Sequence, residues 1–440
     1  MLSSWRLAVE KFNSVRARVG VLGLGYAGLP LTCCFAEAGF ETIGFDIDPR
    51  KIEKLQAGQS YIGHIPEQRI GRLVESRRLR ASSDFALLRD CDAAIICVPT
   101  PLGEGRTPDL TYVVNTAKAV AEHLHRGQLV VLESTTYPGT TDEVLLPLFE
   151  TSGLKAGEDY FLAFSPERED PANASYSTQT IPKIVGGVTA ACGAVAVAAY
   201  SKLVERVVPV SSARVAEAAK LLENIYRCVN IALINELKLL LERMEIDVWE
   251  VIAAAATKPF GFTPFYPGPG LGGHCILVDP FYLTWKAQQF DFSTRFIELA
   301  GEINSAMPQH VVDRLTQGLN LQGKALNGAR ILLIGAAYKR NVEDVRESPA
   351  IRIIQLLNQR LARVSYHDPL VPRLQTRHLE QVLCSEDLCA QSVEAADAVV
   401  IVTDHSSVDY ELILRHAKLV VDTHNVTAPY RKPSHQVVMA

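Results

Sequence analysis

The sequence predicts an α/β protein with two Rossmann-like, doubly wound domains joined by a helical middle domain that contains a long central helix. Three observations lead to this prediction. A glycine fingerprint at residues 23–28 follows a short apolar strand and opens a helix. The C-terminal third repeats the alternation of apolar strands and helices that is typical of parallel sheets covered on both faces. Between them, residues 213–245 contain no Pro or Gly, as expected for a long helix.

The composition is that of a globular protein. The chain has 440 residues, of which 48% are hydrophobic and 21% are charged, and this length allows about two to three domains. The formal net charge of −5 offers no broad basic surface for nucleic acid. The chain has neither an apolar run long enough to span a membrane nor the apolar core of a signal peptide. Nine cysteines without a CxxC pair argue against a disulfide framework or a zinc site, so we expect a cytoplasmic protein without a metal.

The N-terminal half is predicted to contain an extension over residues 1–18 and a first α/β domain over residues 19–210. The extension should form a short amphipathic helix. A second helix is expected over residues 27–39, directly after the glycine fingerprint. The residues of the extension that can pack are Trp5, Leu7, Val9 and Phe12. The strands predicted for the first domain are residues 17–24, 42–45, 93–98 and 129–132.

The C-terminal half is predicted to contain a helical middle domain over residues 211–320 and a second α/β domain over residues 321–440. The helix over residues 213–245 would span roughly 50 Å, so we expect it to connect the two domains and to contact another subunit. The strands predicted for the second domain are residues 329–335, 363–367, 398–402 and 419–421, with a helix over 348–361. Asp368 follows its strand as Asp46 follows its own, but the second domain lacks a full glycine fingerprint.

The glycine fingerprint predicts a dinucleotide site. Gly23 permits a tight turn, Gly25 lets the backbone approach a pyrophosphate, and Gly28 lets helix and strand pack closely. Asp46 should bind the ribose hydroxyls and repel a 2′-phosphate, which favours NAD over NADP. Two further segments follow strands at the edge where ligands bind in this fold. The predicted cofactor-binding residues are therefore Gly23, Leu24, Gly25, Tyr26, Ala27, Gly28 and Asp46, with Val98, Pro99, Thr100, Pro101, Ser134, Thr135 and Thr136.

A glycine-rich loop over residues 267–280 contains the candidate nucleophile. Its glycines predict close backbone approach or an anion-binding nest. Cys275 stands at the end of this loop before a presumed helix, and such a position favours the thiolate. If the stretch is helical, Asp279 lies one turn further on. A Cys/His hydrolase that uses His274 is the competing interpretation, and the dinucleotide fingerprint argues against it.

Three other polar residues are candidates, each with a simpler alternative. Lys220 and Asn224 are spaced i, i+4, so they share one face of the long helix. A solvated helix face would explain them equally well. Glu167, in the segment SPERED, would be an ordinary surface-loop residue if it had no function.

Taken in order, these segments resemble the UDP-glucose/GDP-mannose dehydrogenases, and most of all their bacterial UDP-N-acetylglucosamine 6-dehydrogenase branch. The resemblance runs from about residue 19 to about residue 426. It implies an NAD domain, a helical middle with a dimer-forming long helix, and a C-terminal nucleotide-sugar domain. The motifs are GLGYAGLP at 23–30, VPTPL at 98–102, ESTTYPGT at 133–140, SPERED at 165–170, AKLLENIYRCVNIALINEL at 219–237, FYPGPGLGGHCILVDP at 265–280 and YKRNVEDVRES at 338–348.

The resemblance also implies a four-electron oxidation of a sugar CH2OH group to a carboxylate, with two NAD reduced per turnover. Cys275 would attack the intermediate aldehyde and carry a thiohemiacetal and then a thioester. Lys220 and Asn224 would stabilise developing oxyanions, and Asp279 would orient water or exchange a proton with Lys220. Glu167 would act as the general base in thioester hydrolysis.

Further contacts follow from the resemblance alone. Lys51 and Arg346 would lie on the cofactor side. The substrate-binding residues would be Arg168, Lys258, Phe265, Tyr266, Gly268, Gly270, Leu271, Gly272 and Lys339. Two positions depart from the branch, which usually has Pro where this chain has Leu277 and often has Asp where it has Asn341. These departures bear on loop rigidity and fine substrate preference.

The expected substrate is UDP-N-acetylglucosamine, whose uronate would feed surface polysaccharide synthesis. UDP-glucose, UDP-N-acetylgalactosamine, UDP-N-acetylmannosamine and GDP-mannose remain alternatives. Two other classes also stay open: a single-step NAD-dependent hydroxyacid dehydrogenase, and a non-catalytic sensor of NAD or nucleotide sugar. The hydroxyacid dehydrogenase would leave Cys275 and the second α/β domain unexplained. The sensor would bind its ligands without turnover. We expect a homodimer or a higher homo-oligomer and no nucleic-acid or membrane partner.

Overall fold

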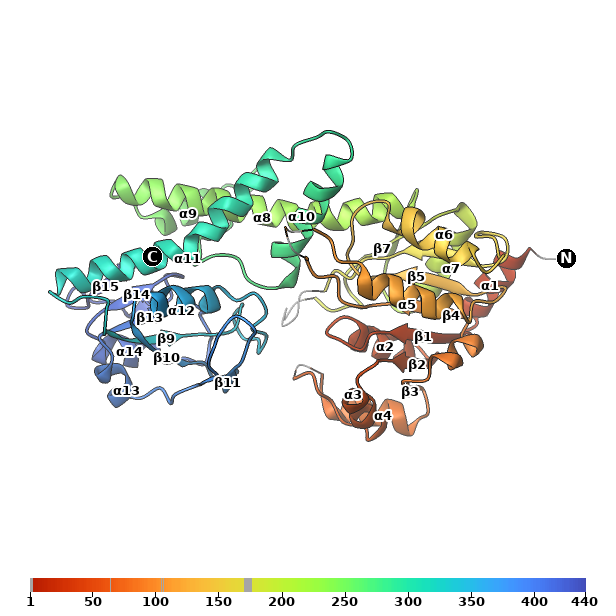
Figure 1. Cartoon of the computed structure of the whole chain (residues 1–440), viewed down its shortest axis with the longest axis horizontal. Helices are drawn as coiled ribbons and strands as arrows, with labels where there is room; N and C mark the ends of the chain where they lie inside the picture. Colours follow the sequence, from red (N-terminus) through yellow and green to blue (C-terminus); the bar gives the residue numbers. More distant parts are fainter. Residues whose placement is uncertain (1–2, 64, 104, 106, 170–175) are drawn as a thin grey trace. The chain divides into compact units, whose positions relative to one another are not determined.

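The computed structural model describes residues 3–63, 65–103, 105, 107–169 and 176–440. It divides into two compact units (Figure 1). Unit 1 comprises Met1–Glu223 and Phe281–Phe292, and unit 2 comprises Asn224–Pro280 and Ser293–Ala440. The chain passes between the units three times: inside the helices α8 (Ala213–Arg243) and α10 (His274–Gln288), and in the loop between Phe292 and Ser293.

Unit 1 is built on an eight-stranded sheet of order β3-β2-β1-β4-β5-β6-β7-β8. The order reverses between β1 and β4, which is the switch point where ligands bind in doubly wound sheets. Neighbouring strands are parallel except β6 and β7, which pair antiparallel. The strands are β1 (Arg18–Leu22), β2 (Glu41–Phe45), β3 (Leu79–Ser82), β4 (Ala93–Ile96), β5 (Leu129–Leu132), β6 (Phe161–Phe164), β7 (Lys183–Gly187) and β8 (Val207–Val210).

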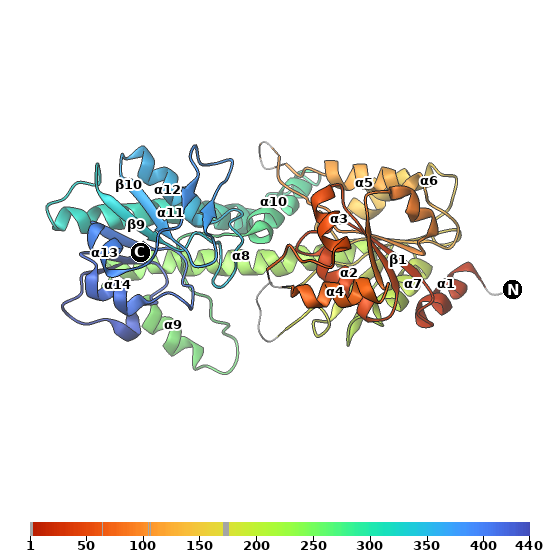
Figure 2. The same ribbon diagram turned by 90° about the horizontal axis from the view of Figure 1, so that it is seen from below.

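Helices cover both faces of this sheet (Figures 1 and 2). Alternate residues of a strand enter opposite cores: Val19 and Val21 of β1 join a cluster with α1, α2 and α7, while Leu22 joins one with α5 and α6. Phe12 of α1 is buried, but Leu7 is 53% exposed and does not pack as expected. The helices are α1 (Ser4–Asn13), α2 (Gly28–Glu37), α3 (Pro49–Gln56), α4 (Glu67–Glu75), α5 (Thr111–Ala121), α6 (Leu146–Glu150) and α7 (Ala190–Tyr200).

Unit 2 contains a parallel five-stranded sheet of order β10-β9-β13-β14-β15. One hydrophobic cluster packs α11 and α12 on this sheet, and another packs α13 and α14. The strands are β9 (Arg330–Ile334), β10 (Arg363–His367), β13 (Ala398–Ile401), β14 (Val420–Asp422) and β15 (Val437–Met439), with the small pair β11 (Arg373–Leu374) and β12 (Leu383–Cys384). The helices are α9 (Val248–Ala256), α11 (Arg295–Leu321), α12 (Pro349–Gln359), α13 (Ala390–Ala395) and α14 (Tyr410–His416).

Asp368, at the end of β10, is bound entirely by its own unit. Oδ2 accepts hydrogen bonds from the N–H groups of Ala336 and Ala337 at 2.7 and 3.0 Å and contacts His405 Nε2 at 3.1 Å. Oδ1 accepts from the N–H groups of Leu370 and Val371. Asp368 therefore matches Asp46 in topology, and both carboxylates accept a hydrogen bond from the turn that follows the neighbouring strand.

The predicted fold class is confirmed. The long helix α8 has 31 residues, and both halves contain the expected sheets. The sequence did not predict that β7 runs against its neighbour β6. Among the described residues, no helix is long and apolar enough to cross a membrane. The division into an N-terminal extension and three domains stays a prediction.

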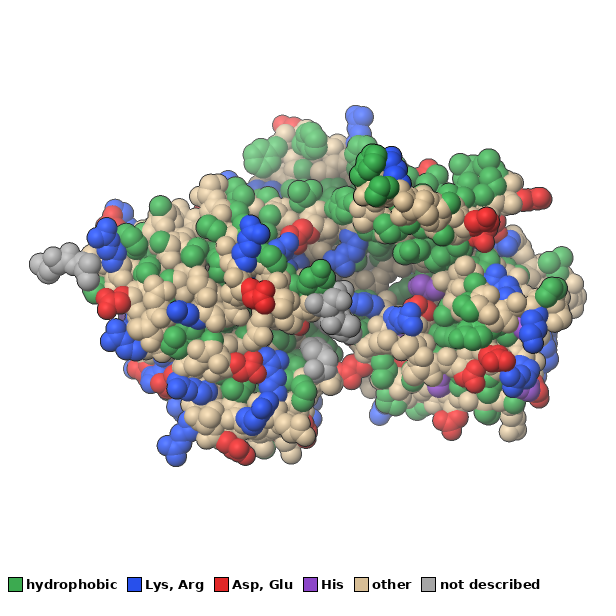
Figure 3. Space-filling model, turned by 180° about the vertical axis from the view of Figure 1, so that it is seen from behind, with side chains coloured by type: hydrophobic (Ala, Val, Ile, Leu, Met, Phe, Trp, Pro, Cys, Tyr) green, Lys and Arg blue, Asp and Glu red, His purple; other side chains and the backbone are tan. Residues whose placement is uncertain are grey.

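One face of α8 presents large apolar side chains to solvent within unit 2. Tyr226, Leu233, Leu237 and Leu240 are between 37% and 52% exposed, and their spacing of three, four or seven residues places them on one side of the helix. Figure 3 shows hydrophobic side chains gathered over this helical region. The contact of α8 with another subunit stays a prediction that this surface favours.

Candidate active site

The glycine turn between β1 and α2 has the geometry of a dinucleotide cradle. Gly23 has φ of 94°, and a Cβ there would lie 2.5 Å from the Cys97 carbonyl oxygen. A Cβ on Gly28 would lie 1.8 Å from the Gly23 carbonyl oxygen, so the turn and the helix can pack only without side chains. A Cβ on Gly25 would meet nothing within 4 Å. The open space over Gly25 fits the close approach of a pyrophosphate.

Asp46 lies at the carboxyl end of β2 and supports this turn. Its Oδ2 accepts a hydrogen bond from the Leu24 N–H at 2.9 Å, and Oδ1 accepts from the Asp48 N–H at 2.9 Å. Lys51 Nζ donates to Oδ2 at 2.8 Å. Tyr61 adds a hydrogen bond from its hydroxyl to the Leu24 carbonyl. Lys51 therefore forms an ion pair with Asp46, and Asp46 bonds to the glycine turn. Both predicted cofactor residues lie beside this turn.

The other predicted cofactor segments follow β4 and β5, which are neighbours in the sheet. Ser134 joins them, because its hydroxyl accepts from the Val98 N–H at 2.9 Å and lies 2.7 Å from the Val98 carbonyl. Thr100 and Thr136 are buried, and the Thr100 carbonyl accepts a hydrogen bond from Tyr282. The structure thus brings these segments together at the carboxyl edge of the sheet. The roles of Leu24, Tyr26, Ala27, Pro99, Pro101 and Thr135 in cofactor binding stay predictions.

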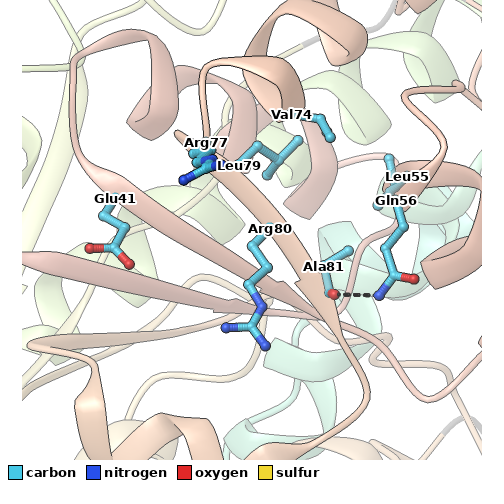
Figure 4. A pocket seen from close by; sticks show the side chains of 8 residues that line it. All are labelled: Glu41, Leu55, Gln56, Val74, Arg77, Leu79, Arg80 and Ala81. Carbon is cyan, nitrogen blue, oxygen red and sulfur yellow. Dashed lines mark hydrogen bonds between the residues drawn. The ribbon is translucent and has the colours of Figure 1, made fainter.

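A surface pocket of unit 1 lies at the opposite edge of the sheet. It is lined by the first residues of β2 and β3 and by the ends of α3 and α4, and Gln56 donates to the Ala81 carbonyl within it (Figure 4). Glu41 and Arg80 are among its lining residues. Because the fingerprint stands at the carboxyl ends of the strands, this pocket is not the predicted cofactor site.

A buried ionic cluster lies at the carboxyl edge of the sheet in unit 1. Lys183 Nζ contacts Glu133 Oε2 at 2.9 Å and Glu167 Oε2 at 3.2 Å. The Tyr200 hydroxyl donates to the other oxygen of Glu133. The Lys183 and Glu133 side chains are 4% and 1% exposed, whereas Glu167 is 19% exposed. The predicted base is therefore the member of this cluster that reaches solvent.

The charges of this cluster fix its protonation. Burial alone would raise the pKa of Glu167, but the Lys183 ammonium and the N–H groups of Arg168 and Glu169 outweigh it and hold that pKa below its ordinary value. Burial raises the pKa of Glu133 despite Lys183. Burial would lower the pKa of Lys183, but its two carboxylate partners raise it. Glu167 is therefore a carboxylate at neutral pH.

Asn224 and Asp279 form the second group of predicted catalytic residues. Asn224 Nδ2 donates to Asp279 Oδ2, and both residues are 1% exposed. Lys220 precedes Asn224 by one turn of α8 and is 8% exposed, so it is not part of a solvated face. Cys275 falls in the first turn of α10, four residues before Asp279, as expected. The side chains of His274, Cys275 and Leu277 lie outside the described residues.

The glycine loop that precedes α10 packs closely within unit 2. The Gly268 N–H donates to Asn235 Oδ1 at 3.0 Å, and Asn235 Nδ2 donates to Asn304 Oδ1 at 2.9 Å. Gly270 has φ of 125°. A Cβ on Gly272 would lie 2.8 Å from Tyr338, and Leu271 is buried. Close packing and a positive φ explain why the loop needs glycine at positions 270 and 272.

Two aromatic residues of the predicted substrate loop are ordered by neighbours. Phe265 meets Tyr226 edge to face at 5.6 Å, and Tyr266 stacks on Trp249 at 5.8 Å. Lys258, two residues beyond the end of α9, lies over the Phe260 ring. The substrate roles of these residues stay predictions.

Three other predicted contact residues lie outside this loop. Arg168 forms an ion pair with Glu223. The Arg346 guanidinium binds Asp344, and the contact of Arg346 with a cofactor stays a prediction. Lys339 is half-buried in unit 2.

The departure at Asn341 has a local structural role. Asn341 has φ of 58°, a conformation that asparagine tolerates better than most residues. Its Oδ1 accepts hydrogen bonds from the N–H and the hydroxyl of Ser406. An aspartate could accept the same bonds, so the substitution preserves the turn.

Four polar residues of this region are not among those that the sequence predicts for the site. Glu133, Lys183 and Tyr200 come from three separate elements, and Glu217 of α8 accepts hydrogen bonds from Gly139 and Thr141. A charged residue that directly adjoins a short apolar strand, as at Glu133 and Lys183, was the available signal.

Comparisons with known proteins identify this architecture. Residues 17–204 match the NAD binding domain of the UDP-glucose/GDP-mannose dehydrogenase family, 214–306 match its central domain, and 332–429 match its UDP binding domain. A UDP-N-acetyl-D-glucosamine 6-dehydrogenase of Pseudomonas aeruginosa is 37% identical over 82% of this chain and 85% of its own. A UDP-N-acetyl-D-mannosamine dehydrogenase of Pyrococcus horikoshii is 36% identical over 93% of this chain and 96% of its own. A solved structure of a UDP-D-ManNAc dehydrogenase from P. horikoshii has a TM-score of 0.86 at 33% identity, covering 96% of this chain and 98% of that one.

Proposed function

This chain belongs to the UDP-glucose/GDP-mannose dehydrogenase family, and from that membership we propose that it oxidises the C6 hydroxymethyl group of a 2-acetamido UDP-sugar to a carboxylate. The chain is an NAD-dependent nucleotide-sugar dehydrogenase, an oxidoreductase. The proposal adds the position oxidised, the number of electrons removed and the sugar. One observation carries it. Asp279, which lies four residues after Cys275 in α10, accepts a hydrogen bond from Asn224 of α8.

NAD fits the residues of unit 1. The open space over Gly25 provides a pyrophosphate cradle, and the Asp46 carboxylate beside Leu24, paired with Lys51, provides a ribose acceptor. Bound NAD would accept a hydride in each of two oxidations. Asp46 would bind the adenosine ribose, and Ser134 would hold the strand ends around the cofactor.

The first oxidation converts the sugar alcohol into an aldehyde. The C6–H bond breaks as a hydride leaves, and the hydroxyl loses its proton. We assign Lys220 and Asn224 to stabilise the developing oxyanion, with Asp279 as proton acceptor or as the residue that orients a water. Burial of all three strengthens their electrostatic effect on charge at the reacting oxygen.

The second oxidation is covalent. The Cys275 thiolate adds to the aldehyde carbon and forms a thiohemiacetal, which keeps the intermediate on the enzyme. Loss of a second hydride and of the hydroxyl proton converts it into a thioester. The position of Cys275 in the first turn of α10 favours the thiolate, because helix N-termini stabilise anions.

Hydrolysis of the thioester completes the cycle. Glu167 would take a proton from water, the resulting hydroxide would add to the thioester carbonyl, and the C–S bond would break to release the thiolate and the carboxylate product. The lowered pKa of Glu167 keeps this base ionised.

UDP-N-acetylglucosamine is the proposed substrate, and its uronate would serve surface polysaccharide synthesis. The PGPGLGGHC loop and the likeness to the P. aeruginosa enzyme support it. UDP-N-acetylmannosamine is the second candidate, because the P. horikoshii relative named for it covers more of the chain.

NADH production against a panel of nucleotide sugars tests the proposal. The panel comprises UDP-N-acetylglucosamine, UDP-N-acetylmannosamine, UDP-N-acetylgalactosamine, UDP-glucose and GDP-mannose. The expected result is two NADH per sugar with a uronate product and the highest kcat/KM for UDP-N-acetylglucosamine. One NADH with a stable carbonyl product would contradict the four-electron reaction. A higher kcat/KM for another sugar would contradict only the substrate.

A further inference from the structure

The reversed strand β7 brings a buried lysine to the edge of the sheet where ligands bind. β7 pairs antiparallel with β6, with Phe164 opposite Gly186, so its first residue, Lys183, lies beyond the carboxyl end of β6 rather than at the far edge of the sheet. Glu133 follows β5 directly, and Glu167 follows β6 by three residues. One strand direction therefore gathers a cation and two carboxylates from three strand ends.

Both oxygens of the Glu167 carboxylate are held. Oε1 accepts hydrogen bonds from the N–H groups of Arg168 and Glu169, each at 2.7 Å. Oε2 accepts from Lys183 Nζ at 3.2 Å. The two backbone N–H groups fix Oε1. Lys183 binds Oε2 and is the charged donor among these three.

Lys183 is itself held from behind. Its ammonium donates to Glu133 at 2.9 Å and lies 5.3 Å from the centre of the Tyr200 ring, while the Tyr200 hydroxyl donates to Glu133. The side chains of Lys183 and Glu133 are almost fully buried, so neither contacts solvent directly to any appreciable extent. A buried ion pair with a second-layer tyrosine keeps the ammonium in place and charged.

We propose that Lys183 is a positioning residue of the reaction, which keeps Glu167 charged and oriented as the base that activates water against the thioester. The inference rests on the proposed function, because it assumes that Glu167 acts in hydrolysis. Glu133 and Tyr200 are the partners that hold Lys183.

The charge balance of the cluster gives the reason. With Lys183 present, two carboxylates share one ammonium. Without it, both carboxylates would lose their counter-charge in a buried site, so the pKa of Glu167 would rise together with that of Glu133. A protonated Glu167 could not accept a proton from water, so hydrolysis would stop while the two oxidations could still occur.

Among the described residues, the other charged and titratable groups around Glu167 do not replace Lys183. Arg168 directs its guanidinium to Glu223 of α8 and to the Pro182 carbonyl. The Glu169 side chain accepts from Thr178. Cys97, after β4, stays a thiol at neutral pH, because burial raises its pKa.

Three variants of the full-length enzyme test the inference through the pH profile of kcat. In Lys183→Met the acid limb is expected to move up by about 1–3 pH units, since loss of a close opposite charge shifts a carboxyl by that amount. Glu133→Gln removes the competing carboxylate and is expected to move the same limb down. Lys183→Arg keeps the cation and is expected to restore most of the profile.

A mass measurement separates the steps. Below the shifted limb, acid-quenched Lys183→Met enzyme is expected to accumulate the sugar-nucleotide adduct on Cys275, after a burst of two NADH per site. A uniform loss of kcat with an unmoved limb and no adduct would show a merely structural lysine and overturn the inference.

Two controls keep the result interpretable. If Lys183→Met fails to fold, the direction of the Glu133→Gln shift still decides, because that variant retains the ammonium. An unmoved or upward limb in Glu133→Gln would overturn the inference. Failure of the wild-type enzyme to form uronate with two NADH would instead contradict the proposed function.

Discussion

Asn224 and Asp279 are joined side chain to side chain, with Asn224 Nδ2 donating to Asp279 Oδ2 over 2.5 Å. The bond links α8 to α10 within unit 2, and it is sealed from solvent. Both side chains are buried. Replacing one of them by an apolar residue therefore costs stability, because the other loses this hydrogen bond where water cannot replace it.

The charge of Asp279 is the first point to test. Asp279→Asn keeps an acceptor oxygen for Asn224 but removes the negative charge, so kcat is expected to fall by about 10²–10⁴-fold, as for loss of a proton acceptor. The melting temperature should change less than in Asp279→Ala, which also removes the hydrogen bond. Wild-type kcat in Asp279→Asn would contradict a role in proton transfer.

Loss of the thiol is expected to separate the two oxidations. Cys275→Ala should bind UDP-sugar and NAD but form almost no uronate, because no covalent intermediate can lead to the second hydride transfer. Single-turnover NADH formation should be affected less than uronate formation. Cys384→Ser, at an exposed cysteine of the same unit, is the matched control and should keep wild-type turnover. Equal uronate yields in both variants would rule out the covalent role.

Asp46 should determine the choice of cofactor. Asp46→Asn removes the charge that opposes a 2′-phosphate and frees Lys51, so the ratio of kcat/KM for NAD over NADP is expected to fall about 10–100-fold, the range for a hydrogen bond to a charged group. Asp48→Asn changes a carboxylate two residues away that caps α3, and it should leave the ratio unchanged. An unchanged ratio in Asp46→Asn would refute the assignment.

Asp368 should govern the acid stability of unit 2. Burial alone would raise its pKa, but His405 and the N–H donors lower it to about 2, from 3.8. A carboxyl with a lowered pKa stabilises the fold above its unfolded value, so this contribution is present above pH 3.8 and is lost as pH falls toward 2.

Asp368→Asn is expected to lower the free energy of unfolding at pH 7 by about 1–3 kcal/mol, as when buried hydrogen-bonding groups lose their partner. Urea unfolding followed between pH 7 and pH 2 measures both effects. The difference between wild type and variant should shrink as the pH approaches 2. A difference that stays constant over this range would contradict the assignment.

Local patterns predicted much of the fold. The fingerprint positions Gly23 and Gly28 are set by backbone geometry that only glycine satisfies, and this geometry follows from residues close in the sequence. The long helix was equally predictable, because the absence of Pro and Gly over α8 is a local property.

Long-range pairings were not predictable from the same patterns. Lys183, Glu133 and Tyr200 are separated by many residues, and they meet because β7 runs against β6. A short apolar strand gives no signal of its direction, and the alternation of strands and helices alone predicts a sheet that is parallel throughout. The same limit applies to Glu217, whose partners Gly139 and Thr141 lie far along the chain.

The stack of Trp249 on Tyr266 gives the protein an optical reporter. The chain has three tryptophans, and the other two, Trp5 and Trp285, belong to unit 1. Indole fluorescence depends on the ring that stacks on it. A sugar nucleotide that displaced Tyr266 would therefore change the fluorescence of Trp249 in unit 2. Occupancy of the glycine loop could then be followed by fluorescence in the unlabelled enzyme, before any NADH is made.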